Sequence, residues 1–200
     1  MTPYYQDAAV TLYHGDCREI LPELERPSIV VADPPYGVSM LRGDSKVRSI
    51  IHGDGDPFDP AHLLGLDVPT VIFGANQFAR LLPVSGGWIV WDKTFPDSAR
   101  FSQAELAWTN YLSTVRIYRE AYHGFMRQRD GWHHPTQKPV KLFTWILEAA
   151  PPGLVVDPYC GSGPVLIAAK DLGRRAIGIE IEERYCEIAA KRCSQEVLPL

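Results

Sequence analysis

Short apolar runs alternate along the chain with stretches whose apolar residues recur at helical spacing. The apolar runs predict β-strands, at residues 10–13, 28–32, 68–73, 87–91, 112–118, 154–156 and 175–179. The stretches between them predict helices, at residues 17–24, 74–82, 139–150, 164–172 and 182–194, with a further short helix opened by a Ser-x-x-Glu capping box at 102–105. Strands alternating with helices indicate an α/β fold, in which helices cover both faces of a mostly parallel central sheet.

Nothing in the composition divides the chain, so we expect a single domain over residues 1–200. Two polar stretches interrupt the pattern, a long loop at 37–60 and a short insertion at about 111–132. Loops of this length are often functional. The tryptophans Trp88, Trp91, Trp108 and Trp145 are expected in the core.

Composition narrows the class of protein. No apolar run is long enough for a membrane span, and the first residues do not resemble a signal peptide. The four cysteines are scattered without a CxxC pair, which argues against a zinc site and favours a reducing, cytoplasmic setting. The net charge of −4 is mildly unfavourable for a nucleic-acid partner. Basic residues nevertheless gather in the two loops and are candidate DNA contacts: Arg42, Lys46, Arg48, Arg127 and Arg129.

The stretch Asp33-Pro34-Pro35-Tyr36 directly follows a predicted strand. Two prolines stiffen the turn and donate no backbone hydrogen bond, so a carboxylate, a carbonyl and an aromatic ring are presented at the carboxyl end of the strand. Two acceptors and a ring suit a planar group that bears an NH2. Read alone, the stretch could also be a proline-rich turn with a capping acid, which is the less favoured interpretation.

A second strand leads into the glycine loop Asp157-Pro158-Tyr159-Cys160-Gly161-Ser162-Gly163 and then a helix. Glu180 stands at the end of the next strand, where an acid can bind a ribose diol. The loop lacks the third glycine of a dinucleotide site and the Lys of a P-loop, so its ligand need not carry phosphates. Asp157 suggests a ligand with a cation or amine, which describes S-adenosylmethionine. A glycine turn that only packs a helix on a strand is the simpler alternative.

Together with His134-Pro135-Thr136-Gln137-Lys138-Pro139, these motifs resemble the amino-methyltransferases of DNA, specifically the β group with circularly permuted motifs. Gly178-Ile179-Glu180 and Gly15-Asp16 resemble two further motifs of that family. The resemblance implies a Rossmann-like, S-adenosylmethionine-dependent methyltransferase fold. It implies a catalytic role for Asp33, Pro34, Pro35 and Tyr36 on a flipped base. It also implies cofactor contacts at Asp16, Cys17, Asp33, His134, Thr136, Gln137, Lys138, Asp157, Tyr159, Cys160, Gly161, Ser162, Gly163, Glu180 and Ile181.

An Asp as the first residue of the catalytic motif resembles adenine-N6 members, whereas cytosine-N4 members more often carry Ser. The family therefore implies methyl transfer to adenine N6 in DNA. N4-cytosine methylation, methylation of RNA or of a protein glutamine, and a non-catalytic DNA-binding subunit remain alternatives. A cytosine-C5 enzyme is rejected, because Cys160 belongs to the cofactor loop. Pro164 departs from the family, which usually has Thr or a similar small residue there.

The chain has little room for a separate target-recognition domain. Sequence specificity is then expected to be short or loose, or to come from the 37–60 loop, a homodimer partner or an additional specificity subunit. A cluster in and after that loop could suggest a metal, but the spacing matches no calcium loop and we predict none: His52, Asp54, Asp56, Asp59 and His62.

Overall fold

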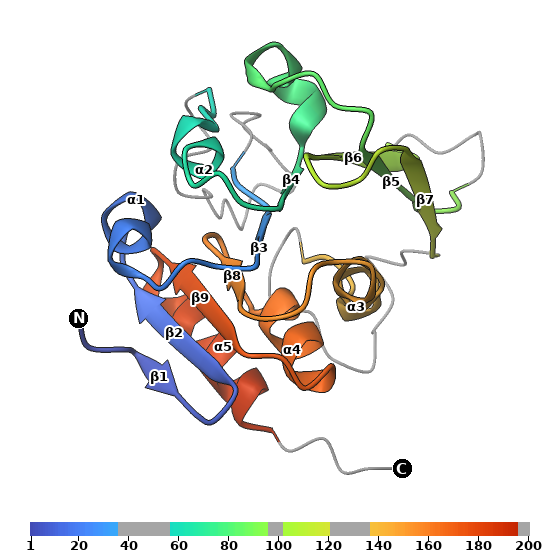
Figure 1. The fold of residues 1–200 in the computed structure, drawn as a ribbon. Coiled ribbons are helices and arrows are strands. Elements are labelled where there is room, and N and C mark those ends of the chain that lie inside the picture. Colours follow the sequence, from blue (N-terminus) through green and yellow to red (C-terminus); the bar gives the residue numbers. More distant parts are fainter. Residues whose placement is uncertain (36–56, 96–101, 121–136, 196–200) are drawn as a thin grey trace, which may run out of the picture.

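The computed structural model describes residues 1–35, 57–95, 102–120 and 137–195 (Figure 1). Within these ranges the strands form a nine-stranded sheet in the order β1-β2-β9-β8-β3-β4-β6-β5-β7. Strands β2, β9, β8, β3 and β4 are mutually parallel, whereas β6 runs antiparallel to β4 and β5. The strands are β1 (Tyr5–Gln6), β2 (Val10–His14), β3 (Ile29–Ala32), β4 (Thr70–Phe73), β5 (Trp88–Asp92), β6 (Ala104–Thr109), β7 (Val115–Arg119), β8 (Val155–Asp157) and β9 (Ala176–Glu180).

Helices cover both faces of the sheet, with α3, α4 and α5 together on one face and α1 and α2 on the other (Figure 1). Three short 3-10 turns accompany them. The helical elements are α1 (Cys17–Ile20), η1 (Leu21–Glu23), α2 (Ala61–Leu64), η2 (Ala75–Gln77), η3 (Ala79–Leu81), α3 (Val140–Glu148), α4 (Pro164–Asp171) and α5 (Glu183–Ser194). No helix in the described part of the chain is both long and apolar enough to cross a bilayer.

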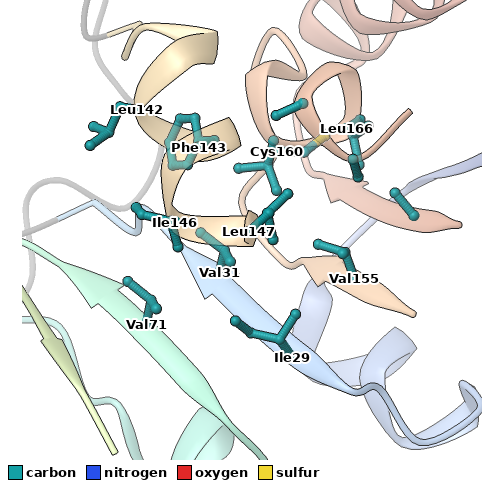
Figure 2. Close-up of a cluster of buried hydrophobic side chains, with 14 of the residues drawn as sticks. Ile29, Val31, Val71, Leu142, Phe143, Ile146, Leu147, Val155, Cys160 and Leu166 are labelled. Atoms are coloured by element: carbon teal, nitrogen blue, oxygen red, sulfur yellow. The ribbon is translucent and has the colours of Figure 1, made fainter. Parts of the chain in front are cut away.

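Strand β3 shows why both faces are buried. Its side chains alternate, so that Ile29 and Val31 join the core under α3, α4 and α5 while Val30 and Ala32 join the core under α1 and α2. Figure 2 shows Ile146 and Leu147 of α3 packed over Val31 and its neighbours. A central strand buried on both sides is typical of parallel sheets. The predicted α/β class, with a mostly parallel sheet covered on both faces, is therefore confirmed.

Two predicted helices are wrong. The capping-box stretch at 102–105 does not open a helix, because residues from Ala104 onward form β6 between β4 and β5. Trp108 of this strand is 1% exposed, so burial in the sheet outweighs the local capping pattern. Residues 74–82 form two 3-10 turns rather than one helix. The short helix α2 was not predicted.

Other sequence predictions hold. Pro164 occupies the first turn of α4, where its missing N–H costs nothing. Helix α3 begins directly after Pro139, as expected. Of the four tryptophans, Trp91 and Trp108 are each 1% exposed. Trp88 and Trp145 are half-buried and pack against the two cores.

Candidate active site

Four acidic residues meet at the carboxyl edge of the parallel strands. Asp16 follows β2, Glu180 ends β9, Asp157 ends β8 and Asp33 follows β3. Because these four strands are parallel neighbours, their carboxyl ends lie side by side. In open α/β sheets this edge is where ligands bind. The glycine loop and the catalytic turn predicted from the sequence thus lie after adjacent strands.

The glycine loop between β8 and α4 is held by its own backbone. The Asp157 carboxylate accepts a hydrogen bond from the backbone N–H of Tyr159 at 3.0 Å, and the Gly163 N–H donates to the Cys160 carbonyl at 2.7 Å. Gly161 has φ +49° and Gly163 φ +79°, a left-handed conformation that favours glycine. The loop therefore turns tightly and brings backbone close to the sheet edge.

Asp157 is buried, with 2% of its surface exposed. Burial raises the pKa of Asp157 well above its ordinary value, and the nearby carboxylates of Asp33 and Glu180 raise it further. A bound cation would lower this pKa and stabilise the ionised form. The acidic edge thus fits a ligand that carries a sulfonium or an ammonium group.

Glu180 connects the glycine loop to the turn that follows β9. One oxygen of its carboxylate accepts from the Gly161 N–H at 2.8 Å and the other from the Glu182 N–H at 2.8 Å. The residue is 9% exposed, and burial raises the pKa of its carboxyl group. Each carboxylate oxygen can accept more than one hydrogen bond. Glu180 can therefore organise the loop and still accept hydrogen bonds from a ribose diol.

Ser162 and Gln137, both predicted at the cofactor site, contact each other. The Ser162 hydroxyl donates to the Gln137 side-chain carbonyl at 3.1 Å, and Arg192 of α5 donates to the Ser162 carbonyl at 2.6 Å. Ser162 is 2% exposed and Gln137 8% exposed. The two side chains therefore join the glycine loop to the segment that precedes α3.

Cys17 and Tyr159 are brought together by a histidine. His62 Nε2 lies 2.7 Å from the Tyr159 hydroxyl and 4.0 Å from the Cys17 sulfur. The ring of Phe58 packs edge-on against both His62 and Tyr159. Burial lowers the pKa of His62, which favours its neutral form. This cluster lies beside Asp16, which caps the start of α1 by accepting from the Arg18 N–H at 2.9 Å.

Lys138 lies at the catalytic turn. Its ammonium forms an ion pair with Asp33 Oδ2, lies 3.2 Å from Glu105 Oε2, and sits 4.8 Å from the centre of the Phe73 ring. Lys93 approaches the other oxygen of Glu105 at 2.6 Å. The Lys138 side chain is only 3% exposed. The lysine predicted to contact the cofactor is thus the partner of the predicted catalytic carboxylate.

Lys138 and Lys93 keep Glu105 charged. Burial by itself would raise the pKa of Glu105, but the positive charges of Lys138 and Lys93 outweigh it, and its pKa lies below the ordinary value. Two carboxylates and two ammonium groups therefore form one chain of ion pairs, from Asp33 through Lys138 and Glu105 to Lys93.

Cys160 is 2% exposed, and burial raises the pKa of its thiol well above the ordinary value. A thiol held neutral in the core is a poor nucleophile. This agrees with rejecting a cytosine-C5 mechanism. Ile181 follows Glu180, and its side chain is 40% exposed. The other predicted site residues lie outside the described part of the chain: Tyr36, Arg42, Lys46, Arg48, Arg127, Arg129, His134 and Thr136.

Sequence reasoning missed four residues that contact the site: Lys93, Glu105, His62 and Arg192. His62 was considered only as a metal ligand, and Glu105 only as a capping residue. Lys93 directly follows β5 at the same edge of the sheet, a position that could have indicated it. Arg192 lies in the last turn of the predicted helix 182–194, and its position there gave no indication of the contact with Ser162.

A model of the DNA methylase family, N6_N4_Mtase, matches residues 89–191. The protein YubD of Escherichia coli (strain K12), named only provisionally as a methylase, is 44% identical over 204 residues, covering 89% of this chain and 87% of YubD. The Type II methyltransferase M2.DpnII of Streptococcus pneumoniae is 27% identical and covers 97% of this chain and 93% of the relative. That alignment spans 249 positions, so the relative has residues that this 200-residue chain lacks.

Solved structures share the fold. The complex of M1.HpyAVI with SAM has a TM-score of 0.64 at 24% identity, covering 92% of this chain and 99% of that one. The cytosine-N4-specific PvuII DNA methyltransferase has a TM-score of 0.71 at 15% identity, covering 98% of this chain and 90% of that one. The methyltransferase fold and the family predicted from the permuted motifs are both confirmed. With its family model matched over half its length and a relative 44% identical over most of it, this chain belongs to the N6/N4 DNA methylase family.

Proposed function

We propose that this chain is a DNA methyltransferase that transfers a methyl group from S-adenosylmethionine to the N6 amine of adenine. The observation that carries the proposal is the adjacency of β3 and β8, because it sets Asp33 beside the glycine loop. A reacting amine held by Asp33 then lies close to a ligand held by that loop. Catalysis of this kind depends mostly on positioning and electrostatics.

The turn after β3 would hold the target base. The Asp33 carboxylate accepts one hydrogen of the exocyclic amine and the Pro34 carbonyl accepts the other, which draws the nitrogen toward tetrahedral geometry and releases its lone pair. Pro34 is buried and Pro35 follows it, so the turn has little freedom. Tyr36 is proposed to stack on the base. Because the amine must reach this edge, the base has to leave the double helix.

The acidic edge would hold the cofactor. Glu180 accepts the ribose hydroxyls, the glycine loop supports the amino-acid tail beside Asp157, and Asp16 and Cys17 lie at the end of the adjacent strand β2. S-adenosylmethionine, when bound, supplies a methyl group on a sulfonium. Gln137, Tyr159, Cys160, Ser162 and Gly163 shape this site through the contacts described above. His134, Thr136 and Ile181 are proposed to complete it.

A radioactive transfer assay tests the function. Unmethylated DNA is incubated with methyl-tritiated S-adenosylmethionine and either the wild-type chain or Asp33→Ala, and the product nucleosides are separated by mass. We expect N6-methyladenine from the wild type and none above background from the variant. N4-methylcytosine would replace the adenine assignment with the second candidate, which the same amine chemistry permits.

Other outcomes of this assay overturn the proposal. Label that enters RNA or protein but not DNA would indicate an RNA or glutamine methyltransferase. DNA binding without any transfer would indicate a non-catalytic subunit. Transfer that survives Asp33→Ala would refute the mechanism while leaving the family assignment intact.

DNA contact is proposed for the loop 37–60 and the insertion at about 111–132 of a single-domain enzyme. The basic residues Arg42, Lys46, Arg48, Arg127 and Arg129 would neutralise phosphates. Since the pneumococcal relative has residues that this chain lacks, target selection would be short or loose, or would use a homodimer partner or an additional specificity subunit. We propose a cytoplasmic enzyme of a restriction-modification type.

The proposed basic DNA contacts predict that binding of a DNA duplex weakens steeply as the salt concentration rises. Binding that does not depend on salt would contradict these contacts.

A further inference from the structure

We propose that Lys138 is a positioning residue for the catalytic turn, which fixes the orientation of the Asp33 carboxylate, and is not a cofactor ligand. The inference rests on the proposed function, since it assigns Lys138 a role in the same methyl transfer. The sequence motif implied that Lys138 contacts the cofactor, so the proposed role is different. Glu105 and Lys93 are proposed to hold Lys138 in position.

The contacts of the Lys138 ammonium within the protein argue against a cofactor-binding role. Its side chain is 3% exposed, and its ammonium is surrounded by the Asp33 carboxylate, the Glu105 carboxylate and the face of the Phe73 ring. A lysine ammonium has three N–H donors. Two carboxylates and an aromatic face satisfy such a group well, because an ammonium is attracted to both. Lys138 is therefore built into the protein beneath the turn.

Glu105 holds Lys138 in line with Asp33. Its register opposite Trp91 in the β5–β6 ladder aims its carboxylate at both lysines, and Lys93 neutralises its outer oxygen. The lowered pKa of Glu105 agrees with a charged group throughout the neutral range. Without Glu105, the Lys138 ammonium would lose a carboxylate that holds it beside Asp33.

The surrounding charges explain why a cation is needed here. Asp157 at the end of β8 and Glu180 at the end of β9 add two carboxyl groups to the edge that holds Asp33. The negative charges of Asp33 and Glu180 both raise the pKa of Asp157. Like charges favour protonation of their neighbours. Lys138 offsets this repulsion from within the fold, because its positive charge acts to lower the pKa of Asp157.

Gln137 and Lys138 couple the two halves of the site. They are consecutive, yet Gln137 accepts a hydrogen bond from Ser162 in the glycine loop while Lys138 pairs with Asp33 in the catalytic turn. The segment before α3 thus spaces the base-binding turn from the cofactor loop.

Single-turnover methyl transfer tests the proposal with Lys138→Met, Lys138→Arg and Glu105→Gln. We expect Lys138→Met to slow transfer by about 100-fold, as for loss of a preorganised electrostatic contact, with the dissociation constant of S-adenosylmethionine changed less than about threefold. Lys138→Arg should restore part of the rate, and Glu105→Gln should cause a smaller loss.

Lys170→Met is the matched control. Lys170 also pairs with an aspartate, Asp7, at 2.7 Å, and its side chain is 28% exposed, but the pair lies away from the site. The control should unfold more easily and keep the wild-type rate of methyl transfer and affinity for S-adenosylmethionine. Equal rate losses in both variants would mean that Lys138 is only structural. If Lys138→Met instead weakens S-adenosylmethionine binding tens of fold and leaves the rate at saturation unchanged, Lys138 is a cofactor ligand and the proposal is wrong.

A second measurement does not depend on methylation. A buried, bonded ammonium exchanges its protons slowly, so the Lys138 15N–1H signal should be visible in the wild type and absent in Lys138→Arg. It should shift in Asp33→Asn and in Glu105→Gln. If the Lys138 signal does not shift in Asp33→Asn, the proposed ion pair is wrong even if methyl transfer occurs. Conversely, a wild-type chain that shows the signal but methylates nothing refutes the proposed function, not the pairing.

Discussion

The cofactor half and the catalytic half of the sheet edge hold their acids in different ways. On the cofactor side, Asp157 accepts a backbone N–H of the turn that follows it, and Asp16 caps its own helix. Glu180 accepts one backbone N–H from the turn that follows it and one from the glycine loop. On the catalytic side, Asp33 pairs with the ammonium of Lys138. Asp157 and Asp16 therefore make these contacts within their own local turn, whereas the contact of Glu180 with Gly161 also requires β8 and β9 to lie side by side. The ion pair at Asp33 forms only when distant segments have packed together.

Replacing Asp33 tests the catalytic half and should have the largest effect. Asp33→Ala removes the acceptor for the amine, and we expect methyl transfer to fall by roughly 1,000-fold or more. Cofactor affinity should change much less than it does in Glu180→Ala. Single-turnover rates and calorimetry with S-adenosylmethionine measure the two effects. The opposite ranking in affinity would overturn the division between the two halves.

Glu180→Ala tests the cofactor half. It removes the proposed ribose acceptor and both backbone contacts, to Gly161 and Glu182. Hydrogen bonds to charged groups contribute about 1.5–3 kcal/mol, so we expect cofactor affinity to fall about 10- to 100-fold. Calorimetry checks it, with Glu187→Ala as the control, because Glu187 only forms an exposed pair with Lys191. Equal losses in the two variants would contradict the role of Glu180.

The backbone of the glycine loop can be tested by a pair of alanine substitutions. Gly163 has φ +79°, and a Cβ there would lie 3.2 Å from the Ala189 side chain. Gly173 has φ +67° with nothing within 4 Å of an added Cβ. Gly173→Ala should cost about 1 kcal/mol of unfolding free energy from backbone strain alone, and Gly163→Ala about 2 kcal/mol. Denaturant unfolding measures both, and equal costs would show that the contact with Ala189 is easily relieved.

Asp7 combines both kinds of partner away from the site. It accepts from the backbone N–H groups of Ala9 and Val10 and pairs with Lys170. Burial opposes its ionisation, but these donors prevail and lower the pKa of Asp7 to about 2 from 3.8. Its stabilisation is therefore present above pH 3.8 and lost as the pH falls toward about 2.

We expect Asp7→Asn to lower the free energy of unfolding by about 1 kcal/mol at pH 7, after allowance for its partial exposure. The difference from wild type should shrink across that acid window. Urea unfolding at several pH values checks it. A difference that is independent of pH would mean that packing, not charge, makes the contribution.

How much could be foreseen from the sequence follows the same division. The glycine loop, Glu180 and the strand leading to Asp33 were predicted, because each depends on a short stretch whose apolar period and turn residues are local. The partner of Asp33 was not, since Lys138 belongs to another motif and nothing nearby shows where its side chain points. Glu105 was misread because a Ser-x-x-Glu pattern predicts a cap equally well when tertiary packing makes it a strand.

The pairing of β2 with β9 has a consequence for synthesis on the ribosome. Strand β2 is synthesised early, but its parallel neighbour β9 ends at Glu180. The two strands therefore cannot pair until residues up to Glu180 have left the ribosome. Strands β3 and β4 can pair much sooner. Long-range parallel pairing is slow and leaves apolar strands exposed meanwhile. The nascent chain therefore pairs β3 with β4 before it can complete either half of the site, and the pairing of β2 with β9 comes last. S-adenosylmethionine in the cell can then stabilise only the finished fold.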